Sequence, residues 1–308
     1  MDYRQFDVIE RMNNMTIFEG SGVAIVTPFN ADGSVNYNKL AELIDFQIEN
    51  GTDSIVICGT TGEAPTLTHD EHIKCIATAV ETTNKRVPVV AGTGSNDTAY
   101  GVKLTREAKE IGADATLQIT PYYNKCTQNG LVAHFTEIAK AADIPMIVYS
   151  VASRTGVNID VSTAVKLSKI DNIVGIKEAS GNISQIADIA NQCGENLDIY
   201  SGNDDQITPL LSLGGKGVIS VIANILPQET HDIVRTFLDG DVEKSKELQL
   251  KYLDLVHLLF SEVNPIPVKA ALNMMGWDVG NCRLPLTPME ESHSKLLKAE
   301  MERLKLIP

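Results

Sequence analysis

The feature that most constrains the fold is a repeat of short apolar runs rich in β-branched residues, each followed by a polar or glycine-rich turn and an amphipathic stretch. Such runs are typical of strands that are buried on both faces of a parallel sheet. Eight of them occur: GVAIVTPF (22–29), SIVICGT (54–60), PVVAGTG (88–94), ATLQIT (115–120), PMIVYS (145–150), NIVGIK (172–177), LDIYSG (197–202) and GVISVIAN (217–224).

The repeat predicts an α/β fold, a closed (β/α)8 TIM barrel over residues 18–238, because its length suits βαβ crossovers of about 30 residues. An open, doubly wound sheet is the alternative, but no GxGxxG follows the first run, where a nucleotide-binding sheet carries its phosphate loop. Beyond about residue 228 the pattern is helical, which predicts a C-terminal helical domain at 239–308. Residues 1–17 are expected to form an extension outside the core, with Met15 as an alternative start.

Composition and charge exclude several classes of protein. No stretch approaches the length of about 18 apolar residues that spans a bilayer, and the first residues lack the apolar core of a signal peptide. The net charge of −14 argues against binding to nucleic acid. The scattered cysteines form no CxxC pair, which suits reduced thiols in the cytoplasm; they are Cys58, Cys75, Cys126, Cys193 and Cys282.

The charged residue that ends the sixth run, Lys177, indicates where a site lies. In (β/α)8 barrels the C-terminal ends of the strands form the active face. A lysine there either extends its ammonium group to solvent or keeps a desolvated amine, whose lowered pKa lets it attack a carbonyl. The residues at the other strand ends distinguish these interpretations.

Polar side chains follow three further runs. The turn at 60–63, Thr-Thr-Gly-Glu, allows backbone amides to converge on a small anion. Tyr149 lies at the end of the fifth run and Arg154 in the loop after it, and tyrosine can transfer a proton while arginine binds a carboxylate. Tyr122 and Tyr123 lie in the loop after the fourth run. These groups on one rim favour the reactive amine.

The motifs GTTGEAPTL, TPYYNK, YSVASRTG, GIKEASGN, SGNDDQ and GGKGVISV, in this order and spacing, resemble the dihydrodipicolinate synthase family, most of all its clostridial and bacillus members. The resemblance extends from about Phe18 to the C-terminus. It implies a (β/α)8 barrel with a C-terminal helical domain. It also implies the condensation of pyruvate with L-aspartate 4-semialdehyde in the diaminopimelate route to lysine, without metal or organic cofactor.

The resemblance also implies the role of each residue. Lys177 would form the Schiff base with pyruvate, and a proton relay would consist of Tyr149, Thr60 and Tyr123. Four further residues would bind the substrates: Thr61 the pyruvate carboxylate, Arg154 the carboxylate of the semialdehyde, and Gly202 and Ile219 as backbone positions that line the pocket. Tyr123 would enter the neighbouring subunit's site across a dimer interface, with dimers pairing into a homotetramer.

Many family members are inhibited by lysine at the dimer interface. Matching residues are present at His69, His72, Asn96 and Tyr122. Tyr100 replaces a glutamate that would receive an ammonium group, and Ala64 replaces a serine. These two departures predict weak sensitivity or none.

Other departures leave alternatives open. The family usually has Asn-x-Pro after the tyrosine, whereas this chain has Ser150-Val151-Ala152, which frees the loop that carries Arg154. Related aldolases, such as N-acetylneuraminate lyase and keto-deoxy-sugar aldolases, share the lysine, the tyrosine and the pyruvate turn; Arg154 together with Thr61 favours the synthase. A catalytically silent barrel that binds a 2-oxo acid would not need the relay.

Two further features have a simpler structural interpretation. Lys269, in the apolar segment NPIPVKAAL, is expected to pack its stem and keep its ammonium group in solvent. His69 and His72 could share a metal ion, but no third ligand is near in sequence. They follow Thr68, which with Glu71 predicts a capping box at the start of a helix.

Overall fold

The computed structural model describes residues 16–308. The alternative start at Met15 and all but the last two residues of the predicted extension lie outside the described residues. Among those described, no helix is long and apolar enough to cross a membrane.

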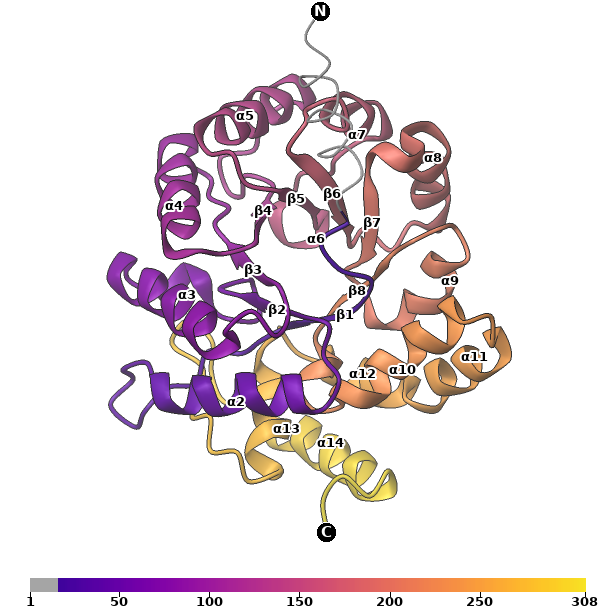
Figure 1. Cartoon of the computed structure of the whole chain (residues 1–308). Helices are drawn as coiled ribbons and strands as arrows, with labels where there is room; N and C mark the ends of the chain where they lie inside the picture. The colour runs from indigo at the N-terminus through magenta and orange to yellow at the C-terminus, as the bar shows by residue number, and fades with distance from the viewer. Residues whose placement is uncertain (1–15) are drawn as a thin grey trace, which may run out of the picture.

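Eight parallel strands close into a barrel in chain order, with β1 paired to both β2 and β8. This confirms the predicted (β/α)8 fold (Figure 1). The strands are β1 (Gly20–Ala24), β2 (Ser54–Ile57), β3 (Val89–Gly92), β4 (Ala115–Ile119), β5 (Met146–Ser150), β6 (Ile173–Glu178), β7 (Asp198–Ser201) and β8 (Gly217–Ser220).

Helices surround the barrel and continue after it. Those between and after the strands are α2 (Tyr37–Glu49), α3 (His69–Thr83), α4 (Thr98–Ile111), α5 (Gln128–Ala141), α6 (Ala152–Thr155), α7 (Val161–Leu167), α8 (Ile183–Cys193), α9 (Ile207–Leu211) and α10 (Pro227–Leu238). Four more form the C-terminal helical region: α11 (Val242–Lys251), α12 (Leu253–Leu259), α13 (Ile266–Met274) and α14 (Glu291–Arg303).

Local sequence explains where the helices begin. The side chain of Thr68 accepts a hydrogen bond from the backbone N–H of Glu71, and the carboxylate of Glu71 accepts one from the N–H of Thr68. This is the predicted capping box, and it satisfies two N–H groups that the first turn of α3 leaves free.

The apolar side chains form separate clusters inside and outside the barrel. Inward-facing residues such as Val56, Leu117 and Tyr200 fill its interior. Ile17 packs against this cluster, although the sequence placed residues 1–17 outside the core. The ring of Phe18 stacks on Tyr200 with a centroid separation of 4.6 Å. The chain entering β1 therefore belongs to the barrel packing.

In the C-terminal helical region, α11 lies beside α10, whereas α12, α13 and α14 pack on the side of the barrel that α2 covers (Figure 1). Leu255 of α12, Leu272 of α13 and Leu297 of α14 share one buried cluster with Leu40 of α2 and Cys75 of α3. The segment between α12 and α13 also reaches the C-terminal ends of the strands, where Phe260 and Asn264 line a cavity.

Candidate active site

Lys177 lies near the end of β6 with its side chain buried, 6% exposed. Its Nζ lies 4.4 Å from the centre of the Tyr149 ring. Burial is the main cause that lowers the pKa of Lys177 to about 8; the charge of Asp204 opposes this change and that of Arg154 adds to it. Near pH 8 a large fraction of the amine is therefore neutral and able to attack a carbonyl.

Tyr149 lies beside the lysine because β5 and β6 pair in a register that places Tyr149 opposite Lys177. Burial raises the pKa of Tyr149, whereas the charge of Arg154 and a side-chain hydrogen bond with Thr60 lower it. The phenol consequently stays protonated near neutral pH. It can donate a proton toward the amine's reaction partner and recover one through the Thr60 hydroxyl.

The turn after β2 is fixed by bonds from distant parts of the chain. Thr27 donates a hydrogen bond from its hydroxyl to the carbonyl of Gly62, at 2.6 Å. Asn264 donates from Nδ2 to Oγ1 of Thr61, at 3.0 Å. Glu63 adopts the left-handed conformation, with φ 54°, which a non-glycine residue adopts only when its surroundings hold it there.

Glu63 is held by a buried ion pair with Lys269 of α13. The Nζ of Lys269 lies 3.0 Å from Oε1 of Glu63 and donates to the carbonyls of Thr27 and Asn281, each at 3.0 Å. Lys269 is only 2% exposed, so the prediction that its ammonium group reaches solvent was wrong. The apolar sequence around it gave no sign of a carboxylate partner that lies 206 residues away.

Arg154 is exposed at the mouth of the barrel, and its Nη2 donates to the backbone carbonyl of Asn264 at 3.3 Å. The loop that carries Arg154 lacks the proline usual in the family, and hydrogen bonds of Ser150 hold it instead. The hydroxyl of Ser150 accepts from the N–H of Ile159 at 3.1 Å and donates to Oδ1 of Asn158 at 3.2 Å. These bonds fix both ends of the segment that carries Arg154, so the departure at Ser150 does not leave it unsupported.

Six of the eight predicted site residues line one cavity of about 170 Å3: Thr60, Thr61, Tyr149, Arg154, Lys177 and Gly202. A second cavity of about 530 Å3 shares Thr60, Tyr149 and Arg154 with it. Ile219 is buried inside the barrel and is not among the residues that line the smaller cavity; Val221, beyond the end of β8, is.

Tyr123 lies away from both cavities. Its side chain is 92% exposed, and its backbone has φ 67°. The loop is fixed, since Asn96 donates from Nδ2 to the carbonyl of Tyr122 at 3.1 Å and Asn124 donates from Nδ2 to the carbonyl of Asn96 at 2.9 Å. A tyrosine presented to solvent by a fixed loop cannot join the relay of its own chain.

The residue that sequence reasoning missed is Asn264, whose side chain donates a hydrogen bond to Thr61 and whose backbone carbonyl accepts one from Arg154. The Asn-Pro pair predicts a break between helices. Nothing in the sequence relates that break to a turn 203 residues earlier.

The predicted histidine pair has other partners. His72 is buried, and its Nε2 bonds the carbonyl of Gly92 at 2.8 Å; Nδ1 of His69 lies 3.4 Å from the hydroxyl of Tyr100.

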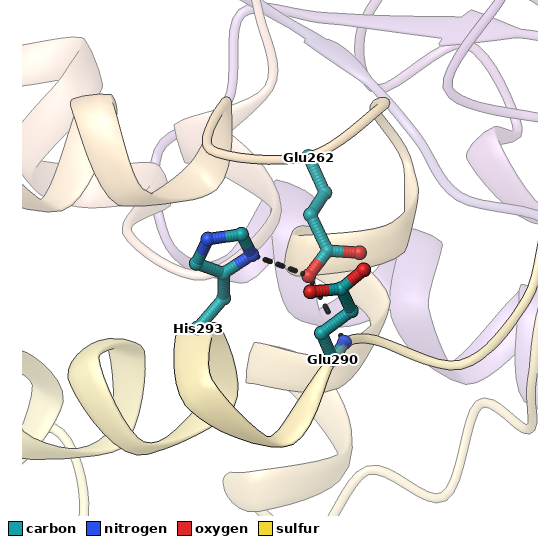
Figure 2. A group of neighbouring side chains, drawn as sticks. All are labelled: Glu262, Glu290 and His293. Atoms are coloured by element: carbon teal, nitrogen blue, oxygen red, sulfur yellow. Dashed lines mark hydrogen bonds and ion pairs between the residues drawn. The ribbon is translucent and has the colours of Figure 1, made fainter.

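Among residues 16–308, the three side chains whose ligand atoms lie close enough to hold a metal ion are Glu262, Glu290 and His293 (Figure 2). Oε1 of Glu262 there accepts hydrogen bonds from the N–H of Glu290 and from Nδ1 of His293, and these bonds join the segment after α12 to the start of α14.

A closed (β/α)8 barrel with a buried lysine beside a tyrosine at its strand ends is the arrangement of the pyruvate-dependent class I aldolases, in which the lysine forms a Schiff base with the keto acid. The sequence pattern of the Dihydrodipicolinate synthetase family matches residues 17–304. The chain belongs to this family, as its motifs indicated.

Curated relatives agree over almost the whole chain. The 4-hydroxy-tetrahydrodipicolinate synthase of Lachnoclostridium phytofermentans is 61% identical over 294 residues, covering 95% of this chain and 100% of the relative. That of Acetivibrio thermocellus is 57% identical over 291 residues, covering 94% and 99%.

Solved structures of the family have the same fold. Dihydrodipicolinate synthase from Aquifex aeolicus superposes with a TM-score of 0.92 at 46% identity, covering 94% of this chain and 99% of that one. The chloride-inhibited enzyme from Acinetobacter baumannii, complexed with pyruvate, has a TM-score of 0.93 at 44% identity, covering 95% and 100%.

Proposed function

We propose that this chain condenses pyruvate with L-aspartate 4-semialdehyde through a Schiff base on Lys177, the reaction of 4-hydroxy-tetrahydrodipicolinate synthases. The observation that carries the proposal is the buried Lys177 amine beside Tyr149, in a small cavity that Thr61 and Arg154 also line. The identity of the two substrates is inferred from the family and from the curated relatives.

The first half of the reaction uses the lowered pKa of the lysine. The neutral amine of Lys177 attacks the ketone carbon of pyruvate, and the resulting carbinolamine loses water to give an imine. Tyr149 supplies the proton for the departing hydroxyl. The imine then loses a methyl proton and becomes an enamine. The hydroxyl of Thr61 and the amides of its turn receive the pyruvate carboxylate, and they add no charge that would hold the lysine protonated.

The second half needs a second carboxylate site. The enamine carbon attacks the aldehyde of the semialdehyde, whose carboxylate binds Arg154 at the cavity mouth. The substrate's own amine then attacks the imine carbon and releases Lys177, which closes the ring. A sugar substrate would have no use for Arg154 in this position, and a barrel that only bound a keto acid would not need Tyr149 and Thr60.

We also propose that the site is completed by a second copy of the chain. Tyr123 is 92% exposed on a fixed loop, as expected for a residue that enters a neighbouring subunit. The family resemblance implies dimers that pair into a homotetramer. The unpaired state of all five cysteines supports a cytoplasmic location.

A coupled assay with pyruvate and aspartate semialdehyde tests the activity. Turnover is expected with this pair and not with pyruvate and N-acetylmannosamine; the opposite preference would assign the chain to the sugar-acid aldolases.

Tyr123→Phe should slow turnover with little change in the free energy of unfolding, because it removes one exposed hydroxyl. A monomer that is fully active in analytical ultracentrifugation under assay conditions would contradict the shared site.

We further propose that L-lysine inhibits this chain weakly or not at all. The dihydrodipicolinate synthase from Cyanidioschyzon merolae, 40% identical to this chain, has been solved with lysine bound. In this chain the larger cavity is lined by Tyr100 and Ala64, which offer neither a carboxylate nor an aliphatic hydroxyl. Losing one charge-assisted hydrogen bond weakens binding roughly ten- to a hundredfold. Half-inhibition below about 1 mM L-lysine at saturating pyruvate would refute this proposal.

A further inference from the structure

Asp204 places a carboxylate in the protein interior without a cationic partner. The residue is 2% exposed and begins a short 3-10 helix (Asp204–Gln206) after β7. Its Oδ2 accepts hydrogen bonds from the N–H groups of Val221 and Ile222, at 3.0 and 2.9 Å. Its Oδ1 has no hydrogen-bond partner among residues 16–308. A buried charge without a counter-charge is costly, so this one indicates a positive charge that appears during the reaction.

The backbone after β7 brings this carboxylate close to Lys177. The N–H of Gly202 donates to the carbonyl of Glu178 at 2.8 Å, which joins the end of β7 to the residue after the lysine. A Cβ on Gly202 would lie 3.0 Å from Cε of Lys177, so this backbone contacts the lysine side chain. Val221, whose N–H bonds Asp204, lines the same cavity as Lys177, whereas Asp204 does not line it. The carboxylate therefore lies behind the cavity wall.

The positive charge on the nitrogen of Lys177 disappears and returns while the imine forms. The neutral amine adds to the ketone carbon of pyruvate and gives a carbinolamine whose nitrogen is uncharged. When the C–O bond of the carbinolamine breaks, the nitrogen lone pair forms the C=N bond, and the hydroxyl leaves as water with the proton of Tyr149. The nitrogen keeps its hydrogen and becomes positively charged. Loss of a methyl proton then returns an electron pair and cancels this charge in the enamine.

A fixed negative charge near this nitrogen acts on two different species. It favours the ammonium form of the free lysine, which cannot attack, and it favours the protonated imine to a similar extent. Burial outweighs the first effect, since it lowers the pKa of Lys177 to about 8 although the charge of Asp204 opposes the change. The same charge is then in place when the imine forms.

We propose that the carboxylate of Asp204 is the counter-charge of the protonated imine that Lys177 forms with pyruvate. This inference rests on the proposed function. Asp204 is in this role a positioning residue, because its charge acts through the nitrogen of Lys177 and not by contact with substrate. Gln249 of α11 holds it in place by donating from Nε2 to the backbone carbonyl of Asp204 at 2.8 Å.

The test measures how imine formation depends on pH in Asp204→Asn. An asparagine oxygen can still accept from the N–H groups of Val221 and Ile222, so the variant removes the charge and keeps these bonds. Each enzyme is equilibrated with pyruvate at several pH values from about 7 to about 10, around the lysine pKa. Brief reduction with borohydride and the mass of the intact protein then give the pyruvate concentration at half-saturation.

The proposal predicts that the difference between the two enzymes grows with pH. At about pH 10, where both amines are neutral, the variant should need roughly tenfold more pyruvate for each unit by which its Lys177 pKa falls, because one field acts on both the ammonium group and the imine. At about pH 7 the ratio should approach one, because the native amine is mostly protonated there and Asp204 stabilises that form equally.

A structural role of Asp204 predicts a different result. A misplaced Lys177 would weaken imine formation by one factor at every pH, and this outcome would overturn the proposal, as would an unchanged half-saturating concentration. Asp205→Asn is the matched control, since it removes the exposed carboxylate next in the chain. It should change the half-saturating concentration by less than about twofold, because solvent screens an exposed charge.

One measurement needs no variant. In native enzyme at a pH above the pKa of Lys177, the Raman C=N stretch of the pyruvate imine should shift in D2O, because the nitrogen of a protonated imine carries an exchangeable hydrogen. A stretch that D2O leaves unchanged would show a neutral imine, which has no need of a counter-charge, and would overturn the proposal. A native enzyme that forms no imine at all would refute the proposed function instead.

Discussion

Among residues 16–308 two lysines are buried, and they have opposite surroundings. Lys269 of α13 places its ammonium group among a carboxylate and two backbone carbonyls, each at 3.0 Å, and 4.2 Å from the centre of the Phe29 ring. Lys177 of β6 places its Nζ over the Tyr149 ring and lines a cavity. Both are nearly inaccessible, at 2% and 6% exposed.

The comparison shows that burial alone does not make a lysine reactive. Burial lowers the pKa of both side chains, but Glu63 opposes that change for Lys269 through charge and a hydrogen bond. The three acceptors around Lys269 also occupy the hydrogens that its nitrogen would have to lose. Lys177 keeps a free approach for a carbonyl carbon. Lys269 is therefore a positioning residue, which holds Glu63 and with it the turn of Thr60 and Thr61.

The largest expected effect concerns Lys177 itself. Lys177→Arg should reduce activity in the coupled assay to the detection limit, because a guanidinium stays protonated at any working pH. Borohydride with pyruvate should add one reduced pyruvate to the GIKEASG peptide of the native enzyme, as peptide mass spectrometry can show. Reduced pyruvate on the peptide that contains Lys269 would show that Lys269 is also reactive, which contradicts the proposed difference between the two lysines.

The second effect concerns stability. Lys269→Met should lower the free energy of unfolding by about 3–5 kcal/mol, because Glu63 then stays buried without a partner. Lys177→Met is the matched variant and should be neutral or stabilising, since it replaces a desolvated amine without breaking an ion pair. Urea denaturation measures both changes. Equal losses would mean that Lys177, too, is paired in the folded state.

Glu63→Gln combined with Lys269→Met sharpens this test. The double variant removes both charges, so it should recover part of the stability that Lys269→Met loses. If Lys269 acts through Glu63 on the pyruvate turn, Lys269→Met should also raise the KM for pyruvate, and the double variant should not restore that KM fully.

How much of this site can be predicted from the sequence depends on how far apart along the chain the contacting residues lie. The apolar repeat predicts the barrel, and strand ends in a barrel must meet, so Tyr149 and Lys177 could be placed together. Asn264 and the partner of Lys269 could not, because each contact joins segments more than 200 residues apart. Tyr123 is proposed to complete the relay of a second chain, and a contact between two chains cannot be located from the sequence of one.

The third effect is on the pH dependence of imine formation. Only the neutral amine attacks, and the pKa of Lys177 is lowered to about 8. The rate of trapping with pyruvate and cyanoborohydride should therefore rise about tenfold per pH unit below pH 8 and level off above it, whereas a solvated lysine would keep rising toward about pH 10. A rate that still increases steeply at about pH 9.5 would show that Lys177 is no more desolvated than a surface lysine.

The smallest effect separates the two charges that act on Lys177. Asp204→Asn should move the midpoint of the trapping profile to lower pH, because the charge of Asp204 raises the pKa of Lys177. Arg154→Gln should move it to higher pH, because the guanidinium lowers that pKa. An asparagine oxygen can still accept from the N–H groups of Val221 and Ile222, which Oδ2 of Asp204 bonds at 3.0 and 2.9 Å.

The two shifts should also differ in size and in their response to salt. Asp204 is buried, at 2% exposed, whereas Arg154 is exposed at the cavity mouth. Solvent and ions screen the field of an exposed charge far more than that of a buried one. Raising the salt concentration from about 0.05 to about 0.5 M should thus shrink the shift caused by Arg154→Gln and leave the larger one of Asp204→Asn nearly unchanged. Equal salt sensitivity would mean that water reaches Lys177 and Asp204 as freely as it reaches Arg154.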